Sequence, residues 1–372
     1  MANASTGKTG PVGVGFIGAG NISDQYLTNL TKFPDVKVHF IADLDLARAA
    51  EQAAKWGVAS SGSVDELLAN PDVEIVVNLT IPAAHAEVDL KCIAAGKHVW
   101  SEKPYAVTRE SAQAVREAAD KAGVLVCVAP DTILGGGVQT GLRAIKAGKI
   151  GKPLTAMTMF QVGGPESWHP SPEFLFAKGA GPLMDMGPYY LSTLVSIFGA
   201  VARVTGTGSK ARETRVIATG PKAGTEFPVE VPTHVSAMIE FVNGASAQCI
   251  FSFENALFRM GFVEVNGTEG TLVMPDPNMF DGENTLHKSM EDISPIELTG
   301  TTYGRGTGLL EMAQAIRGNR AVRIPGDIAF HVLDVMLAIN EAIETKTWVD
   351  VASSLPEINP LPADWDPMVA TL

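Results

Sequence analysis

The sequence predicts an α/β domain with a doubly wound parallel sheet, followed by an α+β domain with an open-faced, mainly antiparallel sheet. In the first third of the chain, short apolar runs alternate with helical patterns of about 10 to 15 residues, which is typical of parallel βαβ units. After Lys149, apolar and polar residues alternate instead, as they do in half-buried antiparallel strands. A chain of 372 residues is also longer than one hydrophobic core usually serves, so we expect two domains.

Composition and charge exclude several classes of function. The formal net charge is -13 and no stretch is rich in Lys and Arg, so the chain would repel nucleic acid. No apolar run is long enough to cross a membrane, and the first residues lack the apolar core of a signal peptide. Cys92, Cys127 and Cys249 lack metal-ligand spacing and are expected to be buried thiols. We therefore expect a cytoplasmic protein with no metal site.

The first predicted unit is a strand, a glycine turn and a helix, which follow a flexible leader over residues 1–11. Two glycines allow the backbone to approach a dinucleotide pyrophosphate, and the free N–H groups at the helix start can bind it. Ser23 replaces the third glycine of the pattern G-x-G-x-x-G, so the motif alone is weak. The residues expected at the cofactor in this turn are Gly18, Gly20, Asn21 and Ile22.

The second predicted strand ends at Asp43, about 20 residues after the glycine turn. An acid at this place binds the ribose 2′-hydroxyl of the adenosine half, which favours NAD over NADP. Arg48, in the first turn of the next helix, could reach a 2′-phosphate and keeps NADP as the weaker alternative. The alternative role of Asp43 is the N-cap of that helix.

Three further predicted strands end in polar or turn residues. Ligands of a doubly wound sheet gather at the carboxyl ends of its strands, so each end is a candidate site. The candidates are Thr80, Pro82 and His85 after the third strand, Glu102 and Lys103 after the next, and Asp131 with Thr132 after the last.

Several segments resemble the family of glucose-fructose oxidoreductase and inositol dehydrogenase, the Gfo/Idh/MocA family. The matching segments are GFIGAGNIS, AGKHV and EKP within 95–104, IGKP at 150–153 and G-x-G-x-L-x-D-x-G at 179–187. The resemblance implies a Rossmann domain that binds NAD(P), an open-faced sheet domain, and oxidation of sugar-like alcohols. It also implies that Lys103 lies near nicotinamide and substrate, that the Lys-Pro bond is often cis, and that His85 touches the ribose or nicotinamide.

The chemistry of alcohol oxidation agrees with a role for Lys103. A group must share the hydroxyl proton while the hydride leaves the carbon, and a lysine can do so where its surroundings lower its pKa. The alternative is a surface lysine before a proline. For His85 the alternative is an ordinary histidine on a helix face.

The segment 179–199 places Asp185 among glycines, prolines and apolar residues. A helix that starts at Pro182 would put Asp185 and Tyr189 on one face, whereas a start near Gly187 would make Asp185 its N-cap. The family pattern here is D-x-G-x-H-x-x-D, and this chain has Tyr189 for the histidine and Ser192 for the last acid. A free tyrosine, with a pKa of about 10, is more readily a donor than a base. Lys103 is thus our first choice as the acid/base, with Asp185 orienting the substrate or Lys103 and Tyr189 completing the network.

Trp168 and His169 lie in a proline-rich loop before this segment. An aromatic face beside hydrogen-bonding groups suits a sugar, and His169 could replace the missing histidine in space. A purely structural loop is the equal alternative.

The domain boundaries follow these changes in pattern. We expect a dinucleotide-binding domain over 12–130, a substrate-binding and oligomerisation domain over 131–350, and a C-terminal tail over 351–372. The single helix expected over 182–198 cannot cover both faces of the antiparallel sheet, so an apolar face would remain exposed in a monomer. We therefore expect a dimer or tetramer formed through the open sheet, with the tail wrapped around a neighbouring subunit.

These observations together predict an NAD-dependent oxidoreductase acting on a secondary alcohol of a neutral sugar, polyol or glycoside. The negative charge and the few basic residues near the expected site favour a neutral substrate over a phosphorylated one. An NAD-dependent glycoside hydrolase, which uses a transient oxidation, is the first alternative. A non-catalytic NAD-binding regulator is the second.

Overall fold

The computed structural model describes residues 8–372, so most of the predicted leader lies outside the described residues. The chain forms two compact units, each built from separate stretches of sequence. Unit 1 contains the described residues up to 136 together with 299–330 and 358–372, and unit 2 contains 137–298 and 331–357.

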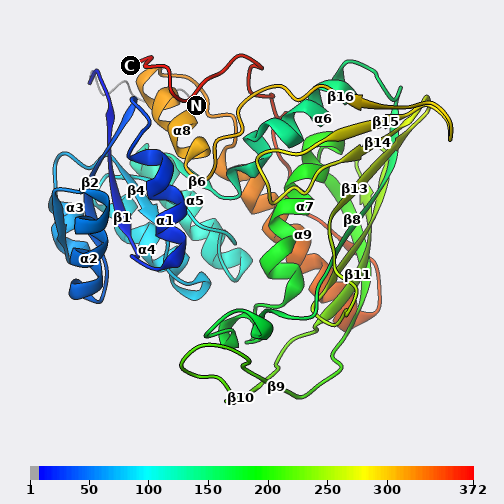
Figure 1. Cartoon of the computed structure of the whole chain (residues 1–372), viewed down its shortest axis with the longest axis horizontal. Coiled ribbons are helices and arrows are strands. Elements are labelled where there is room, and N and C mark those ends of the chain that lie inside the picture. Colours follow the sequence, from blue (N-terminus) through cyan, green and yellow to red (C-terminus); the bar gives the residue numbers. More distant parts are fainter. Residues whose placement is uncertain (1–7) are drawn as a thin grey trace. The chain divides into compact units, whose positions relative to one another are not determined.

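Unit 1 holds a six-stranded parallel sheet with the order β3-β2-β1-β4-β5-β6 (Figure 1). Its strands are β1 (Val12–Ile17), β2 (Val36–Ala42), β3 (Ser60–Gly62), β4 (Ile75–Asn78), β5 (His98–Ser101) and β6 (Val126–Val128). Strands β1 and β4 are buried throughout, as expected of a sheet with helices on both faces. The doubly wound parallel sheet is confirmed. The short edge strand β3 was not predicted.

The helices of unit 1 start and stop where local chemistry favours it. Asp45 caps α2 through two backbone N–H groups, Ser63 and Glu66 form a reciprocal capping box on α3, and Gly57 ends α2 in the left-handed conformation. The helices are α1 (Asn21–Leu30), α2 (Leu46–Trp56), α3 (Val64–Ala69), α4 (His85–Ala94), α5 (Arg109–Ala122) and α8 (Thr307–Arg317), with short 3-10 turns η1 (Pro82–Ala84) and η2 (Asp131–Leu134).

Unit 2 holds a nine-stranded sheet with the order β16-β15-β14-β13-β7-β12-β11-β8-β17. Only β7 and β12 pair in parallel among its described strands, so the predicted mainly antiparallel sheet is confirmed. The strands are β7 (Pro153–Gln161), β8 (Val201–Ser209), β11 (His234–Phe241), β12 (Ser246–Ser252), β13 (Arg259–Gly267), β14 (Thr271–Met274), β15 (Asn284–His287), β16 (Ile293–Ile296) and β17 (Val349–Asp350). A separate hairpin pairs β9 (Thr214–Val216) with β10 (Glu226–Pro228).

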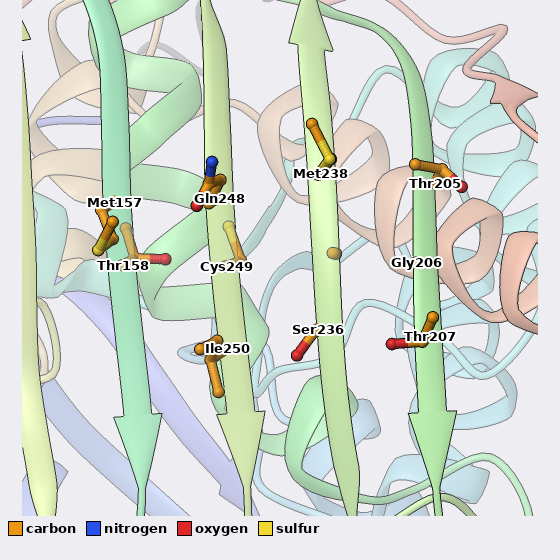
Figure 2. Close-up of a pocket in the computed structure, with 11 residues that line it drawn as sticks. Met157, Thr158, Thr205, Gly206, Thr207, Ser236, Met238, Gln248, Cys249 and Ile250 are labelled. Carbon is orange, nitrogen blue, oxygen red and sulfur yellow. The ribbon is translucent and has the colours of Figure 1, made fainter.

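Three helices of unit 2 pack on one face of this sheet: α6 (Gly136–Lys146), α7 (Pro182–Phe198) and α9 (Gly326–Thr345) (Figure 1). A Cβ on Gly206 of β8 would lie 3.6 Å from Ile339 of α9, which shows how closely helix and sheet approach. The opposite face carries exposed Met157, Met238 and Gln248. There a shallow depression of about 480 Å³ crosses β7, β12, β11 and β8 (Figure 2). The predicted open face therefore exists, although three helices rather than one cover the other side.

The unit boundaries differ from the boundaries expected from sequence because segments near the C-terminus pack with unit 1. Arg317 of α8 binds both carboxylate oxygens of Glu74, at 3.0 and 2.6 Å. Buried Asp35 accepts hydrogen bonds from the backbone N–H and hydroxyl of Thr371. Residues 358–372 of the predicted tail pack with unit 1 of their own chain, and the expected contact with a neighbouring subunit stays a prediction.

The described residues also bear on the expectations about membrane spans, metal sites and cysteines. No helix within residues 8–372 is long and apolar enough to span a membrane. In the same residues, no group of three or more His, Cys, Asp or Glu side chains could hold a metal ion. All three cysteines are buried and free of disulfide bonds, as predicted.

Candidate active site

The glycine turn after β1 has the geometry that a pyrophosphate requires. Gly18 has φ +106, and a Cβ there would lie 2.8 Å from the carbonyl oxygen of Leu79. At Gly20, by contrast, no described atom outside residues 19–21 lies within 4 Å of the position that a Cβ would take. Gly20 is the N-cap of α1, so no side chain covers the first N–H groups of that helix. The turn leaves room and donors for an anion at the start of α1, which begins with Asn21 and Ile22.

Asp43, directly after β2, presents an ionised carboxylate. It accepts hydrogen bonds from the backbone N–H of Ala19 at 2.7 Å and of Asp45 at 2.9 Å. Burial raises its pKa, but bonds from Arg48, Ala19 and Asp45 outweigh burial and lower the pKa below its usual value. Asp45 rather than Asp43 accepts the bonds that cap α2, from Ala47 and Arg48. The alternative that Asp43 is the N-cap is therefore wrong.

Arg48 of α2 makes a two-point ion pair with the same carboxylate. Its Nη2 lies 2.6 Å from Oδ1 and its Nε lies 3.2 Å from Oδ2 of Asp43. About half of the Arg48 side chain is exposed, whereas Asp43 is buried. The pair places the only predicted cation for a 2′-phosphate against the acid that would repel such a phosphate.

The turns after β4 and β5 carry the next predicted residues. Thr80 donates its hydroxyl to Asn78 Oδ1 at 2.7 Å, and Pro82 begins η1. His85 is 1% exposed, with Nδ1 2.7 Å from the carbonyl of Pro104 and Nε2 3.0 Å from that of Thr80. Burial lowers the pKa of His85, while these two carbonyls raise it. Both ring nitrogens thus face the backbone.

Lys103 lies in the turn after β5, at the same carboxyl edge of the sheet as the glycine turn and Asp43. The Lys103–Pro104 peptide bond is cis, and the lysine is half-buried. Its backbone N–H donates to Glu102 Oε2 at 3.0 Å. Its charge is also one of the smaller causes that lower the pKa of His85, after burial.

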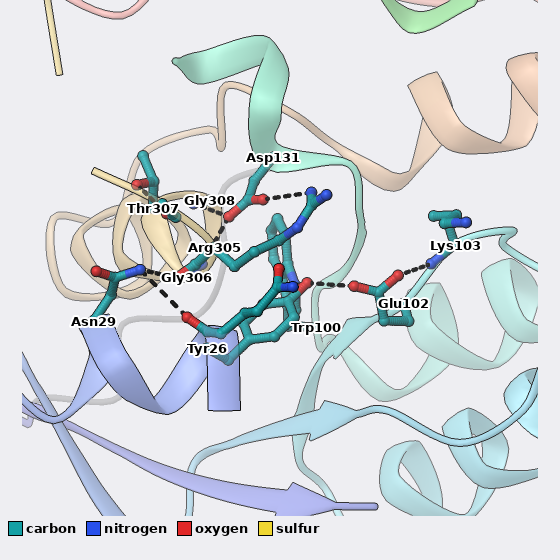
Figure 3. A network of polar contacts seen from close by, with 12 residues as sticks. Tyr26, Asn29, Trp100, Glu102, Lys103, Asp131, Arg305, Gly306, Thr307 and Gly308 are labelled. Carbon is teal, nitrogen blue, oxygen red and sulfur yellow. Dashed lines mark hydrogen bonds and ion pairs between the residues drawn. The ribbon is translucent and has the colours of Figure 1, made fainter. Parts of the chain in front are cut away.

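Glu102 is held by a network that the sequence did not reveal (Figure 3). Its Oε1 accepts from the hydroxyl of Tyr26 at 2.8 Å, and that hydroxyl accepts from Trp100 Nε1 at 3.2 Å. Tyr26 and Trp100 are fully buried. The Glu102 carboxyl is consequently fixed from both oxygens, one by α1 and one by the Lys103 turn.

Asp131, a candidate at the end of β6, has a structural role. Its Oδ2 accepts from the backbone N–H of Gly306 at 2.9 Å and of Gly308 at 3.1 Å, and Arg305 lies 3.6 Å from Oδ1 (Figure 3). These amides are the unpaired donors at the N-terminus of α8, so Asp131 caps that helix from a distant part of the sequence. A Cβ on Gly308 would lie 2.2 Å from the Trp100 ring, which explains the glycine.

In unit 2, α7 begins at Pro182, the earlier of the two starts that the sequence allows. Gly181 is the N-cap, Pro182 the first helical residue, and the Asp185 N–H already bonds the Gly181 carbonyl at 3.0 Å. The alternative that Asp185 is the N-cap is therefore wrong. Asp185 is half-buried in the first turn, and Tyr189, one turn later, is 5% exposed.

His169 and Trp168 form an aromatic group in the loop before α7. The His169 ring lies 5.5 Å from both the Trp168 and Phe174 rings, and Trp168 is 67% exposed. His169 Nδ1 accepts from the Ser171 N–H at 3.0 Å, which leaves the proton of a neutral ring on Nε2. Burial lowers the pKa of His169, against the opposing effects of the Glu173 charge, the Ser171 hydrogen bond and the Asp185 charge. His169 and Asp185 both belong to unit 2.

A buried arginine that the sequence gave no reason to select anchors this loop. Arg215 of β9 is about 1% exposed and pairs with Glu166 of the loop and, at 2.6 Å, with Glu254. It also donates to the Phe253 carbonyl at 3.0 Å. A buried cation with two carboxylate partners resists displacement, because losing one partner leaves an unpaired charge.

Comparison with known proteins identifies both halves of the chain. Residues 12–129 match the family model described as "Oxidoreductase family, NAD-binding Rossmann fold". Residues 138–273 match the model of the GFO/IDH/MocA C-terminal domain. The two matched regions follow each other in the order expected from the sequence.

Curated relatives cover most of the chain. The 1,5-anhydro-D-fructose reductase of Ensifer adhaerens is 28% identical over 271 residues, which make up 70% of this chain and 74% of that protein. The levoglucosan dehydrogenase of Pseudarthrobacter phenanthrenivorans is 28% identical over 355 residues, or 84% of this chain and 88% of that one.

Solved structures share the fold. An NAD binding oxidoreductase from Klebsiella pneumoniae has a TM-score of 0.80 at 27% identity and covers 92% of this chain and 100% of its own. A levoglucosan dehydrogenase in complex with NADH and L-sorbose has a TM-score of 0.80 at 23% identity, with coverage of 93% and 100%. The chain therefore belongs to the Gfo/Idh/MocA family of oxidoreductases with an NAD-binding Rossmann domain.

Proposed function

We propose that this protein is an NAD-dependent dehydrogenase that oxidises a secondary alcohol of a neutral sugar, polyol or glycoside. The observation that carries the proposal is Lys103, which lies in a fixed turn at the carboxyl edge of the sheet that also bears the glycine turn and Asp43. The named activities of the relatives, reduction of 1,5-anhydro-D-fructose and dehydrogenation of levoglucosan, support the substrate class.

The residues of unit 1 fit NAD. The open space at Gly20 and the uncovered start of α1 suit a pyrophosphate, and the Asp43 carboxylate suits a ribose hydroxyl. Bound NAD would supply the hydride acceptor. The residues that we propose to contact it are Gly18, Gly20, Asn21, Ile22, Asp43, Thr80, Pro82 and Lys103, with His85 and Glu102 acting through the backbone of their turns.

Lys103 is proposed as the acid/base. In the oxidation direction its Nζ takes the hydroxyl proton as the hydride leaves the same carbon, and in the reverse direction it returns that proton. Asp185 and Tyr189 are proposed to bind the substrate hydroxyls. Trp168 would offer its exposed ring to a sugar face.

His169 is better suited to donate than to act as the base. Its Nδ1 lone pair is occupied by the Ser171 N–H, so a neutral ring offers Nε2–H to a ligand. A substrate oxygen that accepts this hydrogen bond would be oriented by it. This assignment leaves Lys103 as the group that takes the proton.

The test is NADH formation across a panel of neutral sugars, inositols, glycosides, levoglucosan and 1,5-anhydrosugars. Lys103→Met should lower turnover on the best substrate by about 100-fold to 10,000-fold while NAD binding persists. Lys121→Met, an exposed lysine of α5, is the matched control. Full turnover by Lys103→Met would exclude this residue as the acid/base.

The same panel of sugars tests the two alternative functions. Release of an aglycone with no net NADH would identify a glycoside hydrolase. Binding of NAD with no turnover of any sugar would favour a non-catalytic regulator.

We further infer a homo-oligomer formed through the open face of the unit 2 sheet. Exposed Met157 and Met238 beside the depression in Figure 2 are the supporting observation. Met238→Glu should shift the sedimentation coefficient toward the monomer, and an unchanged coefficient would place the interface elsewhere. The three free cysteines support a cytoplasmic location, which cell fractionation would test.

A further inference from the structure

Asn78, the last residue of β4, connects the two turns that follow β4 and β5. Its Nδ2 donates to Asp89 Oδ1 at 2.7 Å and to the His85 carbonyl at 3.2 Å. Its Oδ1 accepts from the N–H of Thr80 at 3.1 Å and from the Thr80 hydroxyl at 2.7 Å. Its backbone carbonyl accepts from the Glu102 N–H at 2.9 Å. Asn78 therefore bonds to both turns, to Thr80 through its side chain and to Glu102 through its backbone carbonyl.

Asp89 of α4 accepts the shorter hydrogen bond from the Asn78 Nδ2 group and so helps to orient the amide. Asp89 is fully buried, and one of its oxygens accepts from the NH₂ side of that amide. Because the carboxyl oxygen accepts there, the amide oxygen must face Thr80, where two donors await it. Without Asp89, the Asn78 Nδ2 group would lose its shorter hydrogen bond and keep the longer one, to the His85 carbonyl at 3.2 Å.

The link continues from Thr80 to the lysine turn. His85 Nε2 lies 3.0 Å from the Thr80 carbonyl, and Nδ1 lies 2.7 Å from the carbonyl of Pro104, the residue after Lys103. The His85 ring thus spans the two turns. A displacement of Thr80 would be transmitted to Pro104 through the His85 ring. This ring is buried, so it cannot move into solvent to absorb the displacement.

We propose that Asp89 is a positioning residue: by fixing the Asn78 amide it holds the turns that carry Thr80 and Lys103 in place. The role of Lys103 in this statement rests on the proposed function. The holding of the turns does not.

The surroundings of Asp89 are neutral, which suits a positioning role better than an ion pair. Asp89 Oδ2 and the Ser101 hydroxyl of β5 make no hydrogen bond by geometry to another group among residues 8–372, although Ser101 lies close enough to affect the Asp89 pKa. The titratable groups that sense Asp89 are Cys92 on its own helix and Tyr105 after β5, and burial raises the pKa of both. Burial also raises the pKa of Asp89, to about 7.

Three variants of the full chain test the proposal. Asp89→Leu keeps the branched shape in a larger side chain and removes the acceptor, whereas Asp89→Asn keeps both the volume and an oxygen that can accept from Asn78. Glu87→Gln, at an exposed position on the same helix, is the control. Amide hydrogen exchange without cofactor is the first readout, and kcat with the substrate from the sugar panel is the second.

In Asp89→Leu, we expect the backbone amide hydrogens of Thr80 and Glu102 to exchange at least tenfold faster than in the wild type. The exchange rates of the amides in α2 should be unchanged. We expect its kcat to fall tenfold or more while the KM for NAD changes less than threefold, and Asp89→Asn to restore both. If Asp89→Leu does not fold, Asp89→Ala gives the same comparison. Unchanged exchange would overturn the proposal, and faster exchange with a wild-type kcat would overturn the part of it that concerns Lys103.

These outcomes are separable from failure of the proposed function. If Lys103→Met keeps full turnover, the acid/base assignment fails. Faster exchange at Thr80 and Glu102 in Asp89→Leu would still show that Asp89 holds the turns. If both variants leave their readouts unchanged, both proposals fall independently.

Discussion

The candidate residues of unit 1 and those of unit 2 are held by different kinds of structure. In unit 1 they follow the ends of parallel strands, where short turns are fixed by bonds to Asn78, Glu102 and Asp43. In unit 2 they lie on the first turns of α7 and on an irregular loop anchored by Arg215. This difference agrees with the roles that we propose, in which the strand ends of unit 1 bind NAD and the helix and loop of unit 2 bind the substrate.

The largest effect on the unit 2 side is expected at Asp185. Asp185→Asn should lower kcat by about 100-fold, because a neutral amide orients a reacting hydroxyl less strongly than a carboxylate does. The KM for NAD should stay the same, since the residues that we propose to bind NAD belong to unit 1. Steady-state kinetics at saturating NAD would measure this, with exposed Asp292→Asn as the control. A loss of NAD affinity instead would break the division between the units.

The corresponding change on the unit 1 side is Asp43→Ala. Loss of a charged acceptor, worth about 1.5–3 kcal/mol, should raise the KM for NAD by roughly tenfold to a hundredfold and leave the sugar KM unchanged. Release of Arg48 from its ion pair should also narrow the preference for NAD over NADP. Asp45→Ala is the matched control, because it removes only the α2 cap and should cost about 1 kcal/mol of stability with no change in NAD affinity. Equal KM values for the two variants would contradict the ribose role.

The pH dependence of stability should distinguish Asp89 from Asp43 within unit 1. The pKa of Asp89 is raised from 3.8 to about 7 on folding, so the folded chain holds a proton that the unfolded chain has lost. The stability from this proton is present below pH 4 and is lost as the pH rises toward 7, by about 1.4 kcal/mol per pH unit at most. Asp89→Asn should lack this loss and gain stability relative to the wild type at pH 8. Urea denaturation gives the free energy of unfolding of both proteins at pH 5 and pH 8. If this free energy changes with pH by the same amount in the wild type and in Asp89→Asn, Asp89 is ionised at both pH values.

The smallest effect is expected at the exposed ring of Trp168. Trp168→Ala should raise the sugar KM by about threefold to tenfold, since an exposed stacking contact contributes roughly 1 kcal/mol. Thermal stability should barely change because the side chain is mostly outside the core. Trp348→Ala, a second partly exposed tryptophan in unit 2, is the control. Equal effects of both variants on the sugar KM would argue for a structural loop.

Much of unit 1 could be predicted because its signals are local. Period and glycine spacing identify β1, the turn at Gly18 and Gly20, and the strand ends at Asp43 and Lys103. Short strands such as β3, β9 and β17 carry too few residues for a period to show. The start of α7 was left open because Pro188 normally disfavours a helix interior, yet the helix continues through it.

The missed parts of the candidate site depend on pairs that lie far apart in the sequence. Asp131 binds the amides of Gly306 and Gly308, and Tyr26 binds Glu102. No local sequence pattern predicts such a pair, because neither residue departs from the pattern of its neighbours in the sequence. A buried acid such as Asp89, placed where a helix pattern would accept an apolar residue, is the one local signal that could have been followed.

The composite make-up of unit 1 has a practical consequence for anyone who wishes to dissect the protein. A fragment that stops after η2 would lack α8, leave the Asp131 carboxyl without its amides and remove Thr371 and Gln314 from Asp35. A fragment that contains all of unit 1 would have to join three separate stretches of the chain. Deletion of the last two residues alone, Thr371 and Leu372, would remove their hydrogen bonds to the buried Asp35 carboxylate, just before β2.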